Sequence, residues 1–411
     1  MSKYSAGNGG TTRKHVLISG ASIAGNALAH CLNQYGFEVT VVERWGGLRP
    51  GGQAVDLRGV AKEAVRRMGI EEQVRAARTE TDGASFVTRA GRRVATLRAD
   101  QFDGDGLIAE TEILRGDLAQ VFHDAAKDST EYLFGDRITA LHEDPDGVTV
   151  RFAGGDERRF DLVVGADGQH SGTRSLVFGA EERFRRHLDH FVSFFTVPNH
   201  LGLDRWMQVY SEPGRTVAIR SIHDNRAAMA FLTLRSPEFA YDHQDLDAQK
   251  ALVRERFADA GWETPWLLDR LATAPDFFFD AAAQIHLPHW WHGRVALVGD
   301  AAYGPSSLSG QGTSVAVVGA YVLAGELAAA AGDHTSAFPA YQERLQAYVR
   351  RNQAVGESFE RTSTARGRLG VVMQYAAIAA LPYLPFRTFG EMRRAVNDLA
   401  LPDYRHLVRA A

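Results

Sequence analysis

Residues 16–28, VLISGASIAGNAL, have the spacing of a dinucleotide-binding loop, G-x-G-x-x-G, with Ser22 in place of the middle glycine. In such a loop the outer glycines, here Gly20 and Gly25, permit a tight turn and close packing of helix on strand, and the middle residue approaches the pyrophosphate. Glu43 lies 23 residues after Gly20, where a carboxylate can accept hydrogen bonds from ribose hydroxyls. A tight turn with a surface glutamate is the alternative, but the strand–loop–helix–strand–Glu context favours a dinucleotide site.

Two later stretches end buried strands in polar, glycine-rich turns. Residues 161–174, DLVVGADGQHSGTR, bring Asp167 to such a turn, although taken alone this is only a polar turn after a strand. Residues 293–314, GRVALVGDAAYGPSSLSGQGTS, place Asp300 at a strand end and a glycine-rich loop at the start of a long helix. Backbone N–H groups at a helix start carry partial positive charge, which suits the pyrimidine edge of a flavin, where negative charge accumulates on reduction.

The elements that position these loops follow from hydrophobic periodicity. Residues 15–19, 21–36 and 37–44 predict a strand, a helix and a strand, which together make one βαβ unit. Further helices are expected at 60–69, 114–127 and 313–331, and a hairpin with a buried second strand around Gly154–Gly155. Residues 181–286 have the pattern of a small antiparallel sheet inserted between two parts of an α/β domain.

The three motifs, in this order over almost the whole chain, resemble those of single-component (class A) FAD-dependent aromatic hydroxylases, the para-hydroxybenzoate hydroxylase-like monooxygenases. The closest resemblance is to the branch that modifies tetracyclines. Two smaller pieces agree: GGQAVDLRG, with Asp56, resembles a loop near the flavin, and ILRGDL, with Arg115, resembles a helix that faces FAD. Two positions depart from the family pattern: Tyr303 stands where a histidine is common, and Ser307 where the second of two prolines is common.

The resemblance implies an α/β fold, with a Rossmann-like FAD-binding domain, an inserted antiparallel β-sheet substrate domain and a C-terminal helical segment. The expected division is a flexible tail at 1–13, FAD-binding parts at 14–180 and 287–335, a substrate domain at 181–286 and a helical segment at 336–411. The implied cofactor-binding residues are Gly20, Ser22, Ile23, Ala24, Gly25, Glu43, Arg44, Asp56, Arg115, Asp167, Asp300, Gly310, Gln311, Gly312 and Thr313.

Side chains of the inserted sheet are candidates for a flat substrate pocket, with core packing as the alternative for each. These candidates, together with one loop serine, are Phe194, Met229, Phe231 and Ser307. Strand alternation puts Phe194 and Phe195 on opposite faces, so only one of them can face the flavin.

By the same resemblance, the protein is expected to be a monooxygenase that uses NAD(P)H and O2 to hydroxylate an aromatic or polyketide-like small molecule through a flavin C4a-hydroperoxide. The flavin carries the chemistry, so no catalytic side chain is predicted. Only one Rossmann fingerprint is visible, so NAD(P)H is expected to bind without a domain of its own. The alternatives are a flavin oxidase or dehydrogenase without oxygen insertion, and a non-catalytic protein that keeps the FAD fold.

Composition narrows the remaining classes. The chain has 411 residues, a formal net charge of -4 and short, mixed charge clusters, which do not suggest nucleic-acid binding. Cys31 is the only cysteine, so a reducing, cytoplasmic setting is expected. His286, His289 and His292 lack a carboxylate or cysteine that would complete a ligand set, so no metal is expected. The apolar run at 371–386 contains two prolines and is too short to span a membrane. We expect the protein to be a monomer or a weak homodimer.

Overall fold

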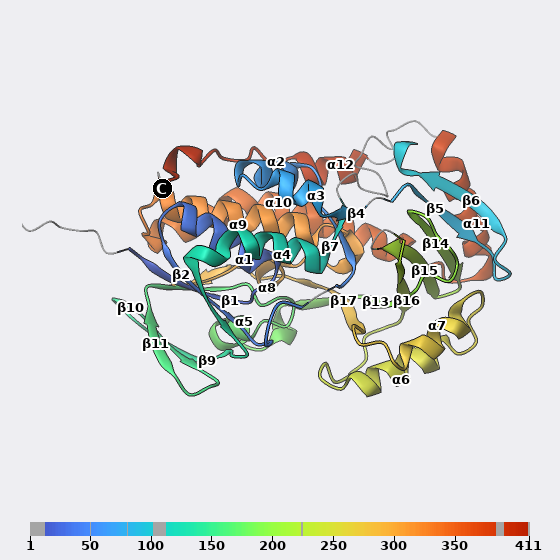
Figure 1. Ribbon diagram of the computed structural model, residues 1–411, viewed down its shortest axis with the longest axis horizontal. Coiled ribbons are helices and arrows are strands. Elements are labelled where there is room, and N and C mark those ends of the chain that lie inside the picture. The colour runs from blue at the N-terminus through green and yellow to red at the C-terminus, as the bar shows by residue number, and fades with distance from the viewer. Residues whose placement is uncertain are drawn as a thin grey trace, which may run out of the picture.

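The computed structural model describes residues 13–49, 51–79, 81–101, 112–222, 225–383 and 390–409. Its elements form two lobes, one built on a mainly parallel sheet and one on a larger, mainly antiparallel sheet (Figure 1). The long strand β13 (Arg185–Pro198) and its neighbour β17 (Phe278–Ile285) run from the first lobe into the second. The fold is therefore the mixed α/β architecture that the sequence predicts.

The parallel sheet organises the first lobe. Its strand order is β18-β19-β12-β1-β2-β8, and every neighbouring pair is parallel except β18 and β19. Along the chain these strands are β1 (His15–Ser19), β2 (Glu38–Glu43), β8 (Thr130–Phe134), β12 (Leu162–Gly165), β18 (Trp291–His292) and β19 (Val295–Leu297). The ends of β1, β12 and β19 therefore bring the three sequence motifs to one edge, where parallel sheets bind ligands.

Helices cover this sheet and share its main core. The helix α1 (Ile23–Gln34) packs against α4 (Arg115–Ala126) and α9 (Gly312–Ala329), and α9 packs against α10 (His334–Thr362). The shorter helices of this lobe are α2 (Val60–Arg67), α3 (Glu71–Ala76), α5 (Gly172–Phe178), α8 (Asp300–Tyr303) and α12 (Gly390–Asn397). Among the described residues, α9 is the one helix that is apolar enough and long enough to cross a membrane, but 78% of its 18-residue length is buried inside the protein. It is a core helix here.

The expected hairpin around Gly154–Gly155 is correct in its first half and wrong in its second. The strands β9 (Ile138–Asp144), β10 (Gly147–Phe152) and β11 (Glu157–Phe160) form a separate antiparallel sheet. The buried stretch that follows, β12, leaves this sheet and pairs in parallel with β1. The sequence pattern merged β11 and β12 because only Asp161 separates them.

The seven-stranded sheet of the second lobe has the order β17-β13-β16-β15-β14-β5-β6. Besides β13 and β17, it contains β14 (Trp206–Glu212), β15 (Arg215–Ile222) and β16 (Ala227–Arg235). Its last two strands, β5 (Gly83–Val87) and β6 (Arg93–Arg98), come from the stretch that the sequence division assigned to the FAD-binding part. The strand β5 joins β14 in parallel, the one parallel pair of this sheet.

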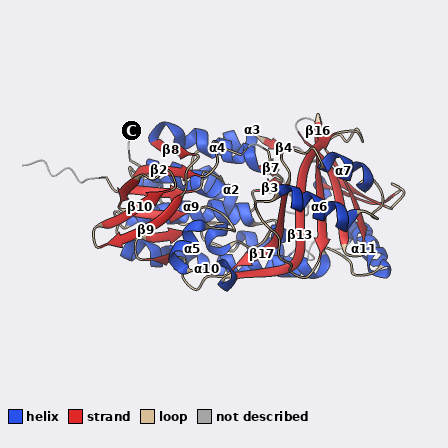
Figure 2. Ribbon diagram, turned by 90° about the horizontal axis from the view of Figure 1, so that it is seen from below, coloured by secondary structure: helices blue, strands red, loops and turns tan. Residues whose placement is uncertain are grey.

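The two faces of this sheet have different partners. One face packs on α6 (Leu246–Phe257) and α7 (Thr264–Leu271), which Figure 2 shows lying across the strands. The other face packs against a small sheet of β3 (Ala54–Asp56), β7 (Glu112–Leu114) and β4 (Arg78–Thr79). This small sheet belongs to the loops around the cofactor motifs, so it brings the second face toward them.

The helix α11 (Arg368–Ala380), which follows α10, packs against the edge strand β6 of the seven-stranded sheet. The hydroxyl of Tyr375 donates to the carbonyl oxygen of Val87 at 2.8 Å and accepts from the backbone N–H of Ser211 at 2.8 Å. These two contacts tie β5 to β14 from outside the sheet.

Candidate active site

The loop after β1 is shaped by its two glycines. Gly20 has a φ of +110°, and a Cβ there would lie 2.6 Å from the carbonyl oxygen of Ala166. A Cβ on Gly25 would lie 1.9 Å from the carbonyl oxygen of Gly20, so α1 can start this close to the strand only with glycine at that position. Ile23 and Ala24 are buried in the first turn of α1 and contribute packing. The loop therefore has the tight strand-to-helix turn of a dinucleotide site.

Glu43 reaches back to this loop from the end of β2. Its Oε2 accepts from the backbone N–H of Ala21 at 2.8 Å, and its Oε1 accepts from Trp45 N–H at 3.1 Å. The carboxylate is thus fixed at the strand end beside the loop, where the sequence expects the ribose. Arg44 is exposed and its guanidinium lies over the Trp45 ring, 5.7 Å from the centroid.

Arg115 lies at the start of α4, opposite the same loop. Its Nη2 donates to the hydroxyl of Ser22 at 2.7 Å. Burial and the nearby charge of Arg49 lower the pKa of Arg115, whereas Asp300 and Glu43 act in the opposite direction. Two guanidinium groups that repel each other beside a dinucleotide-type loop fit a bound anion such as a diphosphate.

Asp300 opens onto the space between these loops. It begins α8, and the residue is accessible to solvent while protein atoms surround its carboxyl group closely. Burial raises the pKa of the Asp300 carboxyl, and Arg115 opposes that rise. A Cβ on Gly304 would lie 3.2 Å from Asp300 Oδ1, and a Cβ on Gly312 would lie 3.6 Å from it. Glycine at both positions keeps the space beside this carboxylate open.

The glycine-rich loop before α9 lies between Asp300 and Asp56. A Cβ on Gly310, which has a φ of +63°, would lie 3.9 Å from Asp56 Oδ2. Thr313 follows at the half-buried first turn of α9. Gln311 is 1% exposed, and neither its Nε2 nor its Oε1 has a hydrogen-bond partner among the described residues. Buried amides are normally satisfied, so this orphaned pair fits a bound polar group at the helix start.

Two serines that flank Ser307 and Leu308, Ser306 and Ser309, stiffen this loop. Ser306 has a φ of +78°, an uncommon conformation for a residue other than glycine. Its carbonyl oxygen accepts from the Ser309 hydroxyl at 2.7 Å, and Ser309 Oγ in turn accepts from Gln311 N–H at 3.0 Å. Ser307 itself is exposed at the start of a 3-10 turn. Hydroxyl hydrogen bonds thus hold the loop where the family commonly has paired prolines.

Tyr303, the other departure, points away from the candidate site. It is 1% exposed, and its hydroxyl lies 2.8 Å from that of Tyr341, which donates to the carbonyl oxygen of Leu297 at 3.1 Å. A Cβ on Gly319 would lie 2.0 Å from the Tyr303 oxygen, so α9 needs glycine there. The tyrosine therefore packs the first lobe and does not take the place of a flavin-facing histidine.

Asp167 is committed to its own loop. Its carboxylate accepts from the N–H of Thr173 at 2.9 Å, from the Thr173 hydroxyl at 2.9 Å and from the Ser171 hydroxyl in a short hydrogen bond. These bonds shape the start of α5, so in this structure Asp167 stabilises the loop that its own motif forms. The neighbouring Arg174, 0% exposed, donates to the carbonyl oxygen of Ala301 at 3.1 Å and so joins this loop to α8.

Asp56 stands in a charged group that the sequence did not reveal. Its Oδ2 accepts from Arg58 Nη2 at 2.8 Å. Nearby, Glu112 of β7 forms an ion pair with Arg220 of β15, and Arg220 also donates to the Thr79 hydroxyl at 2.7 Å. Burial raises the pKa of Glu112 to about 7 against the opposing charge of Arg220, with Asp56 adding to the rise. The pair links the small sheet to the face of the seven-stranded sheet.

That face is aromatic. Phe194 pairs with Phe231 and with Phe278 in the sheet register, and its ring stacks on Phe278 with centroids 5.5 Å apart and meets Phe231 edge-on at 5.4 Å. Met229 lies on the same face and is 1% exposed. Phe195 points to the opposite face and packs in the core with α6 and α7, so the expected alternation is confirmed. Phe278 is a member of this face that the sequence reasoning missed.

The structure thus brings most of the predicted cofactor residues together at the loops that follow β1, β2 and β19 and at the starts of α4 and α9. A separate surface cavity of about 570 Å³ lies elsewhere, against the β9–β10 turn and the start of α10. Its lining residues are Glu143, Asp144, Pro145, His292, Arg294, His334 and Thr335. None of the predicted cofactor residues lines it, so it is not the candidate site.

A family model described as "FAD binding domain" matches residues 13–363, which include every predicted cofactor residue. The chain belongs to this FAD-binding family. It is 40% identical over 403 residues to a flavin-dependent monooxygenase from an unknown prokaryotic organism, covering 95% of this chain and 99% of that protein. It is 45% identical over 341 residues to an uncharacterized protein of Mycobacterium tuberculosis, covering 83% of this chain and 92% of that protein.

Among solved structures, the chain resembles the tetracycline destructase Tet(55), with a TM-score of 0.82 and 38% identity over 95% of this chain and 98% of that one. The family and these relatives identify the chain as an FAD-dependent monooxygenase, an oxidoreductase that acts with O2 on a small molecule. The resemblance to the class A hydroxylases and their tetracycline-modifying branch is confirmed.

Proposed function

We propose that this monooxygenase uses NAD(P)H and O2 to hydroxylate a flat aromatic or polyketide-like molecule. The observation that carries the proposal is the aromatic face of Phe194, Phe231 and Phe278, turned toward the small sheet that holds Asp56. Aromatic rings bind flat, electron-rich molecules by stacking and edge contacts. Similarity to proteins named tetracycline destructases supports a fused-ring substrate of this kind.

The proposed FAD site runs along the ends of β1, β2 and β19. Gly20, Ser22 and Gly25 would accept the adenosine diphosphate end, with Glu43 on the ribose. Arg115 and Asp300 would contact the diphosphate and ribityl groups, and Gly310 to Thr313 would face the ring system. Bound FAD supplies the activation of oxygen, for which it needs electrons from NAD(P)H.

The protein's own residues would bind and orient the substrate and keep water out. The Phe194–Phe278 stack offers a rigid apolar wall, and Met229 packs in the same cluster. Arg220, 3% exposed, is the cation on this face, and its partner Glu112 holds it in place. We propose that the positive charge of Arg220 favours substrates with an enolic or phenolic oxygen. Such substrates have the electron-rich ring that an electrophilic oxygen donor requires.

Labelled oxygen tests the proposal. Purified FAD-loaded protein is incubated with NADH or NADPH under ¹⁸O₂, with a panel of fused-ring phenols and enols that includes tetracyclines. We expect at least one compound to stimulate NAD(P)H oxidation and to gain one ¹⁸O atom by mass spectrometry. Stimulated oxidation that yields only hydrogen peroxide across the panel would identify an oxidase and overturn the proposal. Absence of any turnover in a protein that retains FAD would favour a non-catalytic role.

We further propose that the enzyme works in a reducing, cytoplasmic setting as a monomer or weak homodimer and does not bind nucleic acid. The single cysteine, Cys31, is buried and free, and a net charge of -4 gives no attraction to nucleic acid.

A further inference from the structure

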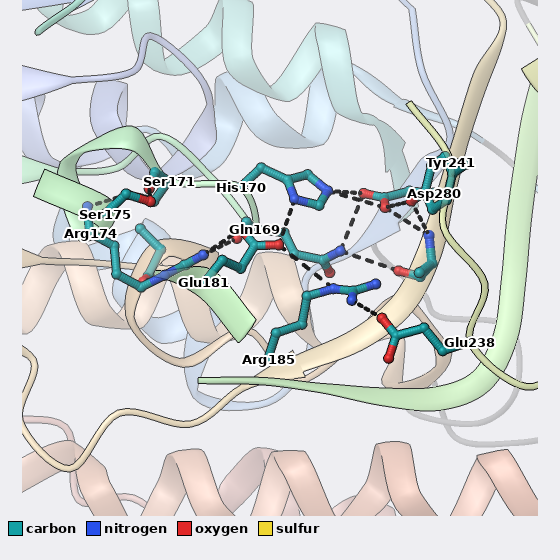
Figure 3. A network of polar contacts seen from close by, with 12 residues as sticks. Gln169, His170, Ser171, Arg174, Ser175, Glu181, Arg185, Glu238, Tyr241 and Asp280 are labelled. Carbon is teal, nitrogen blue, oxygen red and sulfur yellow. Dashed lines mark hydrogen bonds and ion pairs between the residues drawn. The ribbon is translucent and has the colours of Figure 1, made fainter. Parts of the chain in front are cut away.

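A histidine between two carboxylates connects the lobes. His170 lies in the loop after β12, three residues after the motif residue Asp167, and its Nδ1 is 2.9 Å from Glu181 Oε1. Its Nε2 lies 3.2 Å from each carboxylate oxygen of Asp280, on β17 of the seven-stranded sheet. Figure 3 shows the imidazole ring between these two acids. With a carboxylate at each nitrogen, both nitrogens act as donors, which requires the charged, doubly protonated ring.

The surrounding groups favour that charge. Although burial lowers the pKa of His170, the hydrogen bonds and charges of Asp280 and Glu181 together raise it to about 9. The ring of His243 packs against that of His170 at a tilt of 50°, with centroids 3.9 Å apart, and burial and the charge of His170 lower the pKa of His243. The Tyr241 hydroxyl donates to Asp280 at 2.7 Å, and Arg185 lies 3.7 Å from Glu181. His170 is thus the cation that faces Asp280, while Glu181 is shared with arginines.

The same group of residues reaches the cofactor side. Glu181 Oε2 accepts from Arg174 Nη2 at 2.7 Å, and Arg174 Nη1 donates to the carbonyl oxygen of Ala301, directly after Asp300. The charge of Asp280 also contributes to the raised pKa of Asp300, after burial and against Arg115. The positive charge of His170 therefore offsets the negative charge of Asp280, which otherwise acts on Asp300 in the candidate cofactor site.

A metal ion is the alternative occupant. One ligand atom each from His170, His243 and Asp280 lies within 4.8 Å of the others. However, both nitrogens of His170 already have carboxylate partners, and the tilted His243 ring packs against the His170 ring with centroids 3.9 Å apart. The proton on His170 thus takes the place that a cation would occupy.

We propose that the imidazolium of His170 is a positioning group that holds β17 to the loop beside Asp300 and keeps the cofactor site in its FAD-binding form. When the ring loses its proton, Asp280 is left as a buried carboxylate without its counter-charge, and such groups pull in water or move apart. The unbalanced negative charge of Asp280 then adds to that of Asp300 and opposes the diphosphate of FAD. The inference rests on the proposed placement of Asp300 beside FAD, and not on the reaction that follows.

The test is the dissociation constant of FAD as a function of pH, measured by flavin fluorescence on the full-length apoprotein between pH 6 and 10. In the wild type we expect tight binding up to about pH 8 and a weakening of about tenfold as the pH rises through about 9. His170→Gln should bind about tenfold more weakly at pH 7 and lose this dependence on pH. His170→Arg keeps a positive charge, so it should restore part of the affinity without the break near pH 9.

Asp280→Asn provides a second route that leaves His170 in place. Removing this acid should move the alkaline break to a lower pH, because Asp280 helps to raise the pKa of His170, and should make the break smaller, because no unpaired carboxylate is left at position 280. A purely structural role of His170 would do neither. His289→Gln, an exposed histidine outside this group, is the matched control and should behave as the wild type. The proposal is overturned if His170→Gln binds FAD with the affinity and the pH profile of the wild type. It is also overturned if Asp280→Asn binds FAD more tightly while the weakening of binding still occurs near pH 9.

A separate measurement tests the metal alternative. Tighter FAD binding when Zn²⁺ is added to the wild type, but not when it is added to His243→Ala, would favour a metal ion.

Arg115→Ala separates this inference from the site assignment. If Arg115→Ala weakens FAD binding but His170→Gln does not, the site stands and the role of His170 is wrong. If neither variant affects FAD binding, the placement of the cofactor is wrong and both fail. Neither result depends on whether the enzyme hydroxylates its substrate.

Discussion

The guanidinium of Arg115 donates to the hydroxyl of Ser22 at 2.7 Å, which joins the start of α4 to the loop between β1 and α1. The serine that replaces the middle glycine of the fingerprint therefore has a partner of its own. The same arginine is repelled by Arg49 and attracted by Asp300 and Glu43, so it lies where an anion of the cofactor would be stabilised.

Arg115→Ala is expected to raise the FAD dissociation constant by about 10- to 100-fold, because hydrogen bonds to charged groups contribute roughly 1.5–3 kcal/mol. Ser22→Gly should retain FAD with at most a few-fold change, since glycine also allows the backbone approach. Fluorescence titration of the apoproteins measures both. Retention of full affinity in Arg115→Ala, or loss of FAD from Ser22→Gly, would show that this loop has been misassigned.

Phe194 and Phe195 form a natural pair of test and control, because neighbouring residues of β13 face opposite sides of the sheet. Phe195→Ala empties a fully buried core position and should lower the free energy of unfolding by about 3–5 kcal/mol. Phe194→Ala should mainly raise the KM for a stimulating substrate in NAD(P)H oxidation assays, and Phe278→Ala should do the same. A larger KM effect from Phe195 than from Phe194 would contradict the proposed pocket face.

Gly319 and Tyr303 should be coupled. A methyl group on Gly319 would meet the Tyr303 hydroxyl oxygen, so Gly319→Ala is expected to lower the free energy of unfolding by about 1–3 kcal/mol. In Tyr303→Phe the nearest remaining atom is the ring carbon at 3.2 Å, so the same alanine should cost less in that background. A double-mutant cycle in urea gives the interaction free energy. FAD content should stay the same, since Tyr303 points away from the candidate site.

His170 predicts a dependence of stability on pH with a definite sign. Its pKa is raised from 6.5 to about 9 by folding, so its contribution is fully present below about pH 6.5 and is lost as the pH rises through about 9. The difference in unfolding free energy between wild type and His170→Gln should therefore shrink by up to about 3 kcal/mol over that interval, at 1.36 kcal/mol per pKa unit. Urea unfolding of FAD-saturated protein at several pH values measures it. A difference that grows with pH would contradict the charged-ring interpretation.

The sequence was sufficient for the parts of the site that depend on local spacing. Gly20, Gly25 and Glu43 belong to one βαβ unit, whose geometry is set within about thirty residues. The small sheet and the aromatic face depend instead on pairings across the chain. Phe278 lies in a run of three phenylalanines, where alternation alone does not indicate which ring faces the site.

The contacts of His170 could not be predicted from the sequence for the same reason, because they join residues far apart in the chain. Its acid partners, Glu181 and Asp280, follow 11 and 110 residues later, so neither spacing nor periodicity connects the three. The one signal in the sequence was a histidine in the turn after a buried strand. The merging of β11 and β12 into one strand has a similar cause, because it is the choice of partner strand that separates them.

The seven-stranded sheet has a consequence for engineering. Its strands β5 and β6 precede the Asp167 loop in the chain, whereas β13 to β17 follow it. A fragment that spans only 181–286 would expose the edge of β14 that pairs in parallel with β5. It would also lack β5 itself, the strand to which the Tyr375 hydroxyl donates a hydrogen bond. A chimaera that exchanges substrate preference between relatives must therefore transplant two separate segments together, or the borrowed sheet will arrive with an open edge prone to aggregation.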